Sequence, residues 1–251
     1  MTLEIITSEL LTPVRHGFFT RLGGASSGVF KGLNCGIGSS DQAEAVTMNR
    51  TRVAEAMQAD PSQLARMHQI HSADVVTVTT PSPEAPKADG MVTNQPGIVL
   101  SVLTADCQPV LFSDPEAGVI GAAHAGSKGA LAGVLQNTIA AMENLGAKRG
   151  NICAVIGPTI SQRAYEVGPD FMDDFMIEDP TYVRFFAGGQ GDRMQFDLPA
   201  FGLHCLREAG VGQAEWTRHC TYSDPDRFFS YRRCVHQKEA DYGRLIATIR
   251  L

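Results

Sequence analysis

Three short segments place metal-binding side chains directly after apolar, β-like stretches. The segments are Gln69-Ile70-His71-Ser72, Thr104-Ala105-Asp106-Cys107-Gln108-Pro109 and Ala123-His124-Ala125-Gly126. A side chain at the end of a strand can point into a cleft while the strand holds its backbone in place. One thiolate and two imidazoles suit zinc, and a catalytic zinc usually takes three protein ligands and leaves one position open. The residue types therefore suit a zinc site that the fold assembles from His71, Cys107 and His124.

The same residues support two other interpretations. A cysteine beside buried strands often serves as a small apolar side chain, and a histidine at a strand end is often only hydrogen-bonded. Alternatively, Cys107 is a nucleophile, His124 is its base, and Asp106 or another acid orients the imidazole. Asp89, before Gly90, is expected in a turn or as an acid in the cleft. Spacing does not decide among these interpretations, because long separations carry little local signal.

Strands and helices intermix along the chain and must position these residues. The stretch 97–103 is a continuous apolar run, which is typical of a strand buried on both faces. Further extended segments are expected at 67–71, 74–79, 91–93, 109–112, 119–124, 152–156, 215–217, 228–231 and 245–249. Helices are expected after an N-cap at Ser40, and at 127–145, 170–176 and 199–209. We therefore predict one α/β domain over residues 1–251, with a mixed sheet or two packed sheets.

Composition excludes several classes of protein. The 251 residues are 43% hydrophobic and 19% charged, which excludes a disordered chain. The formal net charge of −6 and the lack of a basic run argue against a nucleic-acid partner. No apolar stretch reaches the ~18 residues of a membrane span, and the first residues lack the basic region of a signal peptide. We expect a cytoplasmic protein without a membrane partner, whose six cysteines are reduced.

A series of phrases runs in order from residue 17 to residue 233. They are GFFTRLGG at 17–24, NCG at 34–36, NR at 49–50, QIHS at 69–72, ADG at 88–90, TADCQPV at 104–110, HAG at 124–126, GPTI at 157–160, YEVG at 165–168 and FFSYRR at 228–233. Together they resemble the polyphenol oxidase or laccase-domain family of YfiH-like proteins. Members of that family are also described as purine nucleoside phosphorylases and as peptidoglycan editing factors.

The resemblance implies a zinc site at His71, Cys107 and His124. It also implies a sandwich of mixed β-sheets with helices on the outer faces, similar to the fold of a glutamine-deamidating toxin with a Cys–His site. The chain departs from the family pattern after residue 126, where Ser127-Lys128-Gly129 replaces the common Trp-Arg-Gly. Lysine keeps the charge of arginine but loses its bidentate geometry. A second departure is CVHQK at 234–238, where an acid-containing turn is common. The family's metal ligands are therefore all present in this chain, whereas residues that could set its substrate preference differ.

The activity that the resemblance implies is purine nucleoside chemistry. It covers phosphorolysis of adenosine, inosine, guanosine or methylthioadenosine, and deamination of adenosine. Zinc lowers the pKa of a bound water to about 7, which suits deamination. Phosphorolysis needs cations that hold phosphate, and Arg50, Lys128 and Arg232 are the candidates. Tyr165 is a further candidate for substrate binding, because its phrase is expected beside the site.

Three alternative functions remain open. One is an amidase that edits a nucleotide-linked peptidoglycan precursor with activated water or with Cys107. Another is a non-catalytic regulator that binds a metal or a nucleotide. The third, a copper-dependent polyphenol oxidase, is disfavoured, because multicopper oxidases need a blue-copper site and a cluster held by many more histidines. The chain has seven histidines and no His-x-His pair, so we expect zinc, with copper as the less favoured metal.

Overall fold

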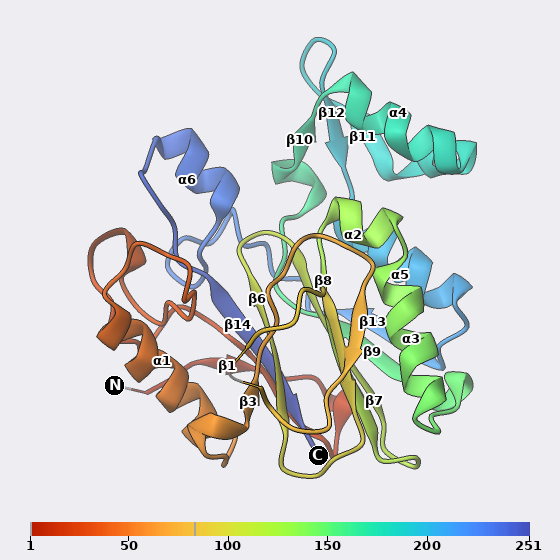
Figure 1. The fold of residues 1–251 in the computed structure, drawn as a ribbon. Helices are drawn as coiled ribbons and strands as arrows, with labels where there is room; N and C mark the ends of the chain where they lie inside the picture. The colour runs from red at the N-terminus through yellow and green to blue at the C-terminus, as the bar shows by residue number, and fades with distance from the viewer. Residues whose placement is uncertain (1, 83) are drawn as a thin grey trace.

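Two β-sheets pack face to face at the centre of the computed structural model, which describes residues 2–82 and 84–251 (Figure 1). The five-stranded sheet has the order β1 (Ile5–Ile6), β2 (Arg15–Phe19), β14 (Leu245–Arg250), β6 (Val99–Thr104) and β3 (Leu64–Ala65). The six-stranded sheet has the order β13 (Gln213–Trp216), β9 (Cys153–Ile156), β7 (Gln108–Asp114), β8 (Val119–Ala125), β5 (Gly90–Thr93) and β4 (Val75–Thr77). Both sheets contain parallel and antiparallel pairs.

Successive side chains of a strand point to opposite faces of its sheet, so one face packs against the other sheet and the other face packs against helices. On β8, Ile120 and Ala122 pack in the cluster that also contains Leu100 of β6 and Ile249 of β14, so this face meets the other sheet. The opposite face of β8 carries Ala123, which packs in the cluster with the helices. Because both faces of the strand are buried, its sequence is a continuous apolar run and not an alternating one.

Helices cover the outer face of each sheet. The six-stranded sheet is covered by α3 (Val134–Asn144) and α5 (Leu198–Glu208), and the five-stranded sheet is covered by α1 (Ala43–Ala56), as Figure 1 shows. The remaining helices are α2 (Ser127–Leu131), α4 (Pro169–Glu178) and α6 (Tyr231–Gln237). The expected sandwich of mixed sheets with helices on its outer faces is therefore confirmed. No helix in the described part of the chain has the length and apolarity needed to cross a membrane.

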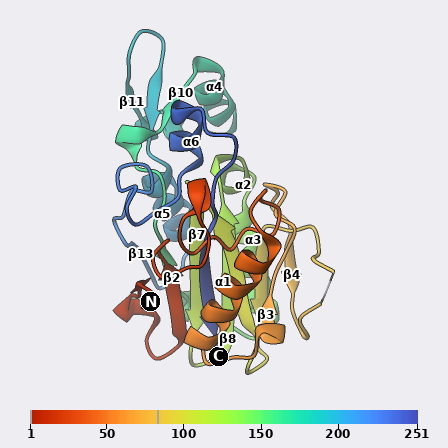
Figure 2. The same cartoon turned by 90° about the vertical axis from the view of Figure 1, so that its left-hand side faces the viewer.

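A small third sheet lies at one end of the sandwich. Its strands are β10 (Glu166–Val167), β12 (Met194–Phe196) and β11 (Phe186–Gly188), and α4 packs beside them. Phe175 of α4 stacks on Phe171, and its ring also lies against Phe196 and Phe201. Figure 2 shows that this unit extends beyond the ends of the long strands. The aromatic contacts join it to α5 and thus to the body of the molecule.

The prediction of a single helix over 127–145 is wrong. The structure has two helices there, because Gly133 between α2 and α3 adopts a left-handed conformation with φ 96°. A left-handed residue cannot continue a right-handed helix, and glycine adopts that conformation without steric cost. The break lets α2 begin directly after the HAG segment while α3 turns back along the sheet.

Three smaller expectations are also wrong. No strand forms over 67–71, because the side-chain amide of Gln69 occupies the backbone N–H and C=O of Leu103 that a neighbouring strand would use. The extended segment expected at 228–231 ends in a helix, because the Ser230 hydroxyl accepts from the N–H of Arg233 and caps α6. Ser40 is not the N-cap of α1, since its N–H and hydroxyl both donate to Asp241.

Gly157 marks a close approach of the two sheets. A Cβ at this position would lie 2.1 Å from the ring of Phe18 on β2. We expect Gly157→Ala to lower the free energy of unfolding by about 1–3 kcal/mol, because a buried phenyl ring between sheets cannot move aside without strain. Urea unfolding measures the change. Gly150→Ala is the control, since no atom lies within 4 Å of its added Cβ. Equal stability losses in the two variants would contradict the explanation.

Candidate metal and substrate site

The chain crosses from the five-stranded sheet to the six-stranded sheet at two connections that meet. One crossing joins β3 to β4 and contains His71, and the other joins β6 to β7 and contains Cys107. His124 lies near the end of β8, and its register partner is Pro109 of β7. The fold therefore brings the three segments of the sequence analysis to one end of the space between the sheets.

The three candidate ligands lie close together. The ligand atoms of His71, Cys107 and His124 are all within 4.8 Å of one another. The Sγ of Cys107 is 4.0 Å from Nε2 of His71, and the two imidazole rings are 4.8 Å apart between centroids. His71 is exposed, Cys107 is partly buried and His124 is buried. The group is thus open to solvent on one side and enclosed on the other.

Asp89 is the carboxylate that orients both histidines. It is fully buried, and its Oδ1 accepts a hydrogen bond of 2.8 Å from Nδ1 of His124. Its Oδ2 accepts from the N–H groups of Ile70 and Ser72 and from the Ser72 hydroxyl, which flank His71. Burial opposes the charged form, but these hydrogen bonds and the charge of His124 lower the pKa of Asp89 to about 2. Because Nδ1 of His124 is occupied, Nε2 is the nitrogen available to a metal or a proton.

Asp106, one of the acids expected to orient His124, does not do so, and the other option, another acid, is met by Asp89. The carboxylate of Asp106 accepts instead from the hydroxyls of Thr221 and Ser230 and from the N–H of Arg232. Its backbone has φ 90°, and its carbonyl accepts from the Thr159 hydroxyl. Asp106 therefore fixes the backbone of the crossing that carries Cys107. The carboxylate that orients the His124 ring is Asp89. Serine and threonine partners so far along the chain gave no local signal in the sequence.

Charge in the site favours a thiolate beside an imidazolium when no metal is bound. Burial raises the pKa of Cys107, but the positive charge and hydrogen bonding of His124, together with the hydrogen bond of His71, lower it to about 7. Burial lowers the pKa of His124, but the Cys107 thiolate and the Asp89 carboxylate raise it to about 9. The thiolate is the form of cysteine that binds metals and attacks electrophiles.

Two contacts hold the exposed ligand in place. Gln69 joins the loop of His71 to β6, since its Nε2 donates to the carbonyl of Leu103 at 2.7 Å and its Oε1 accepts from the Leu103 N–H at 2.8 Å. Gly126 lies close on the other side, where an added Cβ would be 3.2 Å from the His71 ring and 2.8 Å from the Cys107 sulfur. The loop of His71 is therefore packed between β6 and the segment that follows β8.

The donor set fits a zinc ion. In a tetrahedral zinc site with nitrogen and sulfur ligands, the donor atoms are separated by about 3.5 Å. Cys107 Sγ and His71 Nε2 are 4.0 Å apart and all three donor atoms lie within 4.8 Å of one another, so side-chain rotations would be needed to bring them to this separation. The histidine–carboxylate contact at Asp89 is the usual outer support of a zinc-bound imidazole. These residues would hold the metal and leave one position open toward the solvent.

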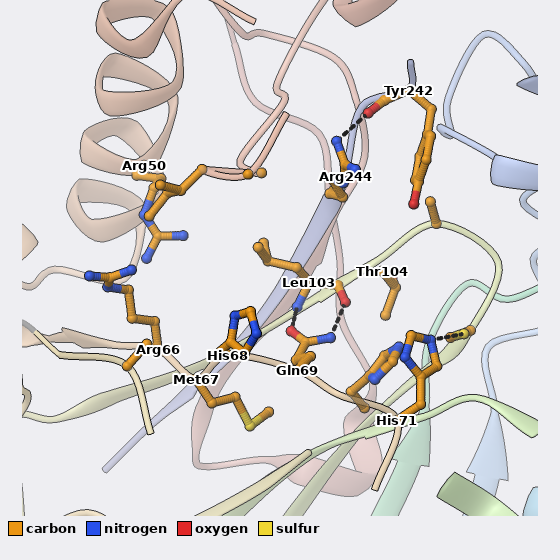
Figure 3. A pocket seen from close by; sticks show the side chains of 17 residues that line it. Arg50, Arg66, Met67, His68, Gln69, His71, Leu103, Thr104, Tyr242 and Arg244 are labelled. Atoms are coloured by element: carbon orange, nitrogen blue, oxygen red, sulfur yellow. Dashed lines mark hydrogen bonds between the residues drawn. The ribbon is translucent and has the colours of Figure 1, made fainter. Parts of the chain in front are cut away.

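A pocket of about 420 Å³ opens beside the three ligands (Figure 3). Of the four residues expected to bind substrate, Arg50 lines this pocket. Tyr165 and Arg232 lie together outside its lining: the Arg232 guanidinium is 5.3 Å from the Tyr165 ring and donates to the Glu166 carbonyl. Lys128 is exposed on α2 and also lies outside the lining. The structure thus brings Arg50 to the candidate ligands and leaves the other three outside this pocket.

Sequence reasoning missed two further arginines in the pocket wall. Arg66 directly follows β3 on the crossing that carries His71, and Arg244 directly precedes β14. Neither lies in a phrase that resembles the family, and their common location depends on the pairing of β3, β6 and β14 in one sheet.

The fold and site together define a class: an α/β sandwich with a cysteine–histidine donor set where the chain crosses between its sheets. The family model described as "Multi-copper polyphenol oxidoreductase laccase" matches residues 15–251, and the chain belongs to this family. The resemblance inferred from the sequence is thereby confirmed.

Relatives and solved structures extend this assignment. The chain is 39% identical over 245 residues to a "Purine nucleoside phosphorylase" of Deinococcus radiodurans, with 95% of this chain and 89% of the relative covered. It is 36% identical to "Purine nucleoside phosphorylase YfiH" of Escherichia coli, with 85% and 86% covered. A crystal structure of a Neisseria meningitidis protein matches with a TM-score of 0.90 and 36% identity over 100% of this chain and 99% of that one. The names of the relatives indicate an enzyme of the purine nucleoside phosphorylase type.

Proposed function

We propose that this protein is a zinc-dependent purine nucleoside phosphorylase whose reaction centre is His71, Cys107 and His124. The observation that carries the proposal is the convergence of these three donors within 4.8 Å at the wall of a pocket. The pocket volume of about 420 Å³ lies in the range of small-molecule sites, ~300–1,000 Å³. The printed names of the relatives support the same activity.

The proposed roles follow from the contacts. His71, Cys107 and His124 would hold the metal, which when bound supplies a Lewis acid for charge that develops on the substrate. Asp89 keeps the His124 ring in one orientation and one tautomer. In phosphorolysis a phosphate oxygen bonds to C1′ of the ribose as the C1′–N bond breaks. The electron pair leaves with the purine, which takes up a proton, and ribose 1-phosphate results.

The same pocket is proposed to deaminate adenosine. That reaction adds water at C6 of the purine and releases ammonia, so it consumes no phosphate. Adenosine, inosine, guanosine and methylthioadenosine are the proposed phosphorolysis substrates. Lys128, Tyr165 and Arg232 lie outside the lining of this pocket and stay proposed substrate contacts. The N–H of Arg232 donates to Asp106, next to Cys107, and the Tyr165 hydroxyl donates to Ser127, next to Gly126.

We expect inosine cleavage to require phosphate and adenosine deamination to proceed without it, because the two reactions use different nucleophiles. The assay follows hypoxanthine and ribose 1-phosphate formed from inosine, with and without phosphate, and inosine formed from adenosine in parallel. Enzyme of defined metal content is used throughout. If no purine nucleoside yields ribose 1-phosphate, the phosphorylase proposal is wrong.

A second candidate is an amidase that acts on a nucleotide-linked peptidoglycan precursor. The observation that favours it is the array of Cys107, His124 and Asp89, in which the thiol pKa is lowered to about 7. The Cys107 thiolate would attack the amide carbon to form a thioester, and His124 would give its proton to the departing amine. Water would then hydrolyse the thioester. Amino-acid release from such a precursor, without nucleoside cleavage, would favour this function.

A further inference from the structure

The charged residues in the lining of the pocket are strongly biased toward one sign. Arg50, Arg66 and Arg244 all line it, and no aspartate or glutamate is among the described residues of its wall. The whole chain has a formal net charge of −6, so this cluster runs against the overall balance. A cleft lined by one sign of charge concentrates ligands of the opposite sign.

Arg50 has little within the protein to offset its charge. It extends from α1, is half-buried, and donates to the Cys35 carbonyl over a long distance of 3.4 Å. No acidic group pairs with it in the described ranges 2–82 and 84–251. Burial and the nearby charge of Arg66 both lower the pKa of Arg50. Arginine nevertheless stays protonated in proteins, so two like charges face the same cavity.

Arg244 completes the cluster and is held firmly. Its Nη1 donates to the Asp241 carboxylate at 3.2 Å and to the Tyr242 carbonyl at 2.8 Å. Its guanidinium also lies 4.1 Å from the centre of the Tyr242 ring. These contacts use part of its donor capacity and fix its position, and a guanidinium has five N–H donors in all.

We propose that Arg50, Arg66 and Arg244 form a subsite for a tetrahedral oxyanion of the phosphate class. Figure 3 shows Arg50 and Arg66 across the pocket from His71, with His68 and Gln69 between them. Planar guanidinium groups match the oxygen pairs of phosphate, and three of them around one cavity can hold a dianion from several sides. The inference deepens the proposed function and rests on it for the identity of the anion.

Two sources of that anion share this chemistry. One is free phosphate, the co-substrate of phosphorolysis. The other is a phosphate ester on the sugar of the substrate, with the purine or the C1′ bond directed toward the three candidate metal ligands. Either source would fill the cavity between the arginines, and the experiment below distinguishes them.

The test measures equilibrium binding by calorimetry, without turnover. Inorganic phosphate, adenosine and adenosine 5′-monophosphate are titrated into the wild type, Arg50→Met, Arg66→Met and Arg52→Met. The last variant is the matched control, because Arg52 lies on the same helix, donates to the Gly23 carbonyl and does not line the pocket. We expect phosphate binding to weaken about 10-fold or more in the first two variants and to stay unchanged in the control.

The pattern of results identifies the source. If the subsite holds free phosphate, adenosine and its monophosphate bind the wild type equally, and the KM for phosphate rises in Arg50→Met. If it holds a substrate phosphate, the monophosphate binds more tightly than adenosine, and that advantage disappears in the variants. Arg50→Lys, which keeps the charge without the fork, should lie between wild type and Arg50→Met.

Two outcomes would overturn the subsite. One is the absence of saturable binding of either phosphate or the monophosphate to the wild-type protein in the millimolar range. The other is equal binding in all three methionine variants. Because no turnover is needed, arginine-dependent phosphate binding without any ribose 1-phosphate production would count against the proposed function and leave the subsite standing.

Discussion

Replacement of Cys107 by serine will remove turnover of purine nucleosides while the protein stays folded. Replacement of His124 by alanine will also remove turnover, but at a cost in stability, because His124 is buried and is the hydrogen-bond partner of the buried Asp89 carboxylate. Each residue supplies one of three donor atoms that lie within 4.8 Å of one another. Groups that act as a unit lose most of their effect when one is removed, so we expect kcat/KM to fall on the order of 10³-fold or more. Cys107 is partly buried at the rim of a pocket, so the serine variant opens no cavity in the core.

Metal analysis separates the two mechanisms proposed for the site. Loss of zinc together with activity in Cys107→Ser supports the metal-dependent phosphorylase, whereas loss of activity with zinc retained favours the thiol nucleophile. Cys153→Ser is the control, because Cys153 begins β9 and lies outside the site. Near-native turnover in Cys107→Ser or His124→Ala would show that the reaction occurs elsewhere.

The second large effect is expected for Asp89→Asn. This fully buried carboxylate accepts from the His124 ring and from the N–H groups on both sides of His71. An amide of the same shape removes the negative charge and offers an N–H where an acceptor is needed, so the His124 ring loses its fixed orientation and the backbone on both sides of His71 loses an anchor. Substitution of such outer partners costs about 10–100-fold in metal affinity or activity.

A shift in metal affinity will distinguish positioning from general destabilisation. Competition with a zinc chelator should give a weaker zinc Kd for Asp89→Asn, with a nearly unchanged zinc Kd for Asp74→Asn. Asp74 is exposed on the same connection between β3 and β4, so its substitution makes the same change of charge. If both variants bind zinc like the wild type, Asp89 does not act through the histidines.

The strands nearest the site could be predicted from sequence because both of their faces are buried. The runs at 97–103 and 119–124 are continuously apolar, and β6 and β8 are found there. Their ends therefore placed Cys107 and His124 close to a common edge. His71 is proposed with them from its place after a β-like stretch, and the family order of the phrases then favours the metal site over the alternative interpretations.

The remaining features of the site could not be predicted from sequence, because they depend on contacts between distant segments. His71 lies on no strand and has a left-handed backbone, φ 61°. Its loop is held by the bonds of the neighbouring Gln69 to Leu103 and by Asp89, both Leu103 and Asp89 being distant in sequence. Asp106 stands beside Cys107 in sequence, yet its carboxylate is directed to residues more than a hundred positions later. Arg50 lies on α1 and Arg66 directly follows β3, so their common pocket depends on how α1 packs on the five-stranded sheet. Such pairings leave no periodic signal, since each involves a single residue.

The two crossings that lead from the five-stranded sheet to the six-stranded sheet meet at His71 and Cys107, beside His124 of β8. An ion bound by His71, Cys107 and His124 would link the two connections to each other and to β8, and it would bind only the folded chain, in which these residues meet. By mass action such an ion adds to the free energy of unfolding in proportion to the logarithm of its concentration, about 2.7 kcal/mol at one hundred times its Kd. The melting temperature of the whole domain would then rise with the free concentration of that ion.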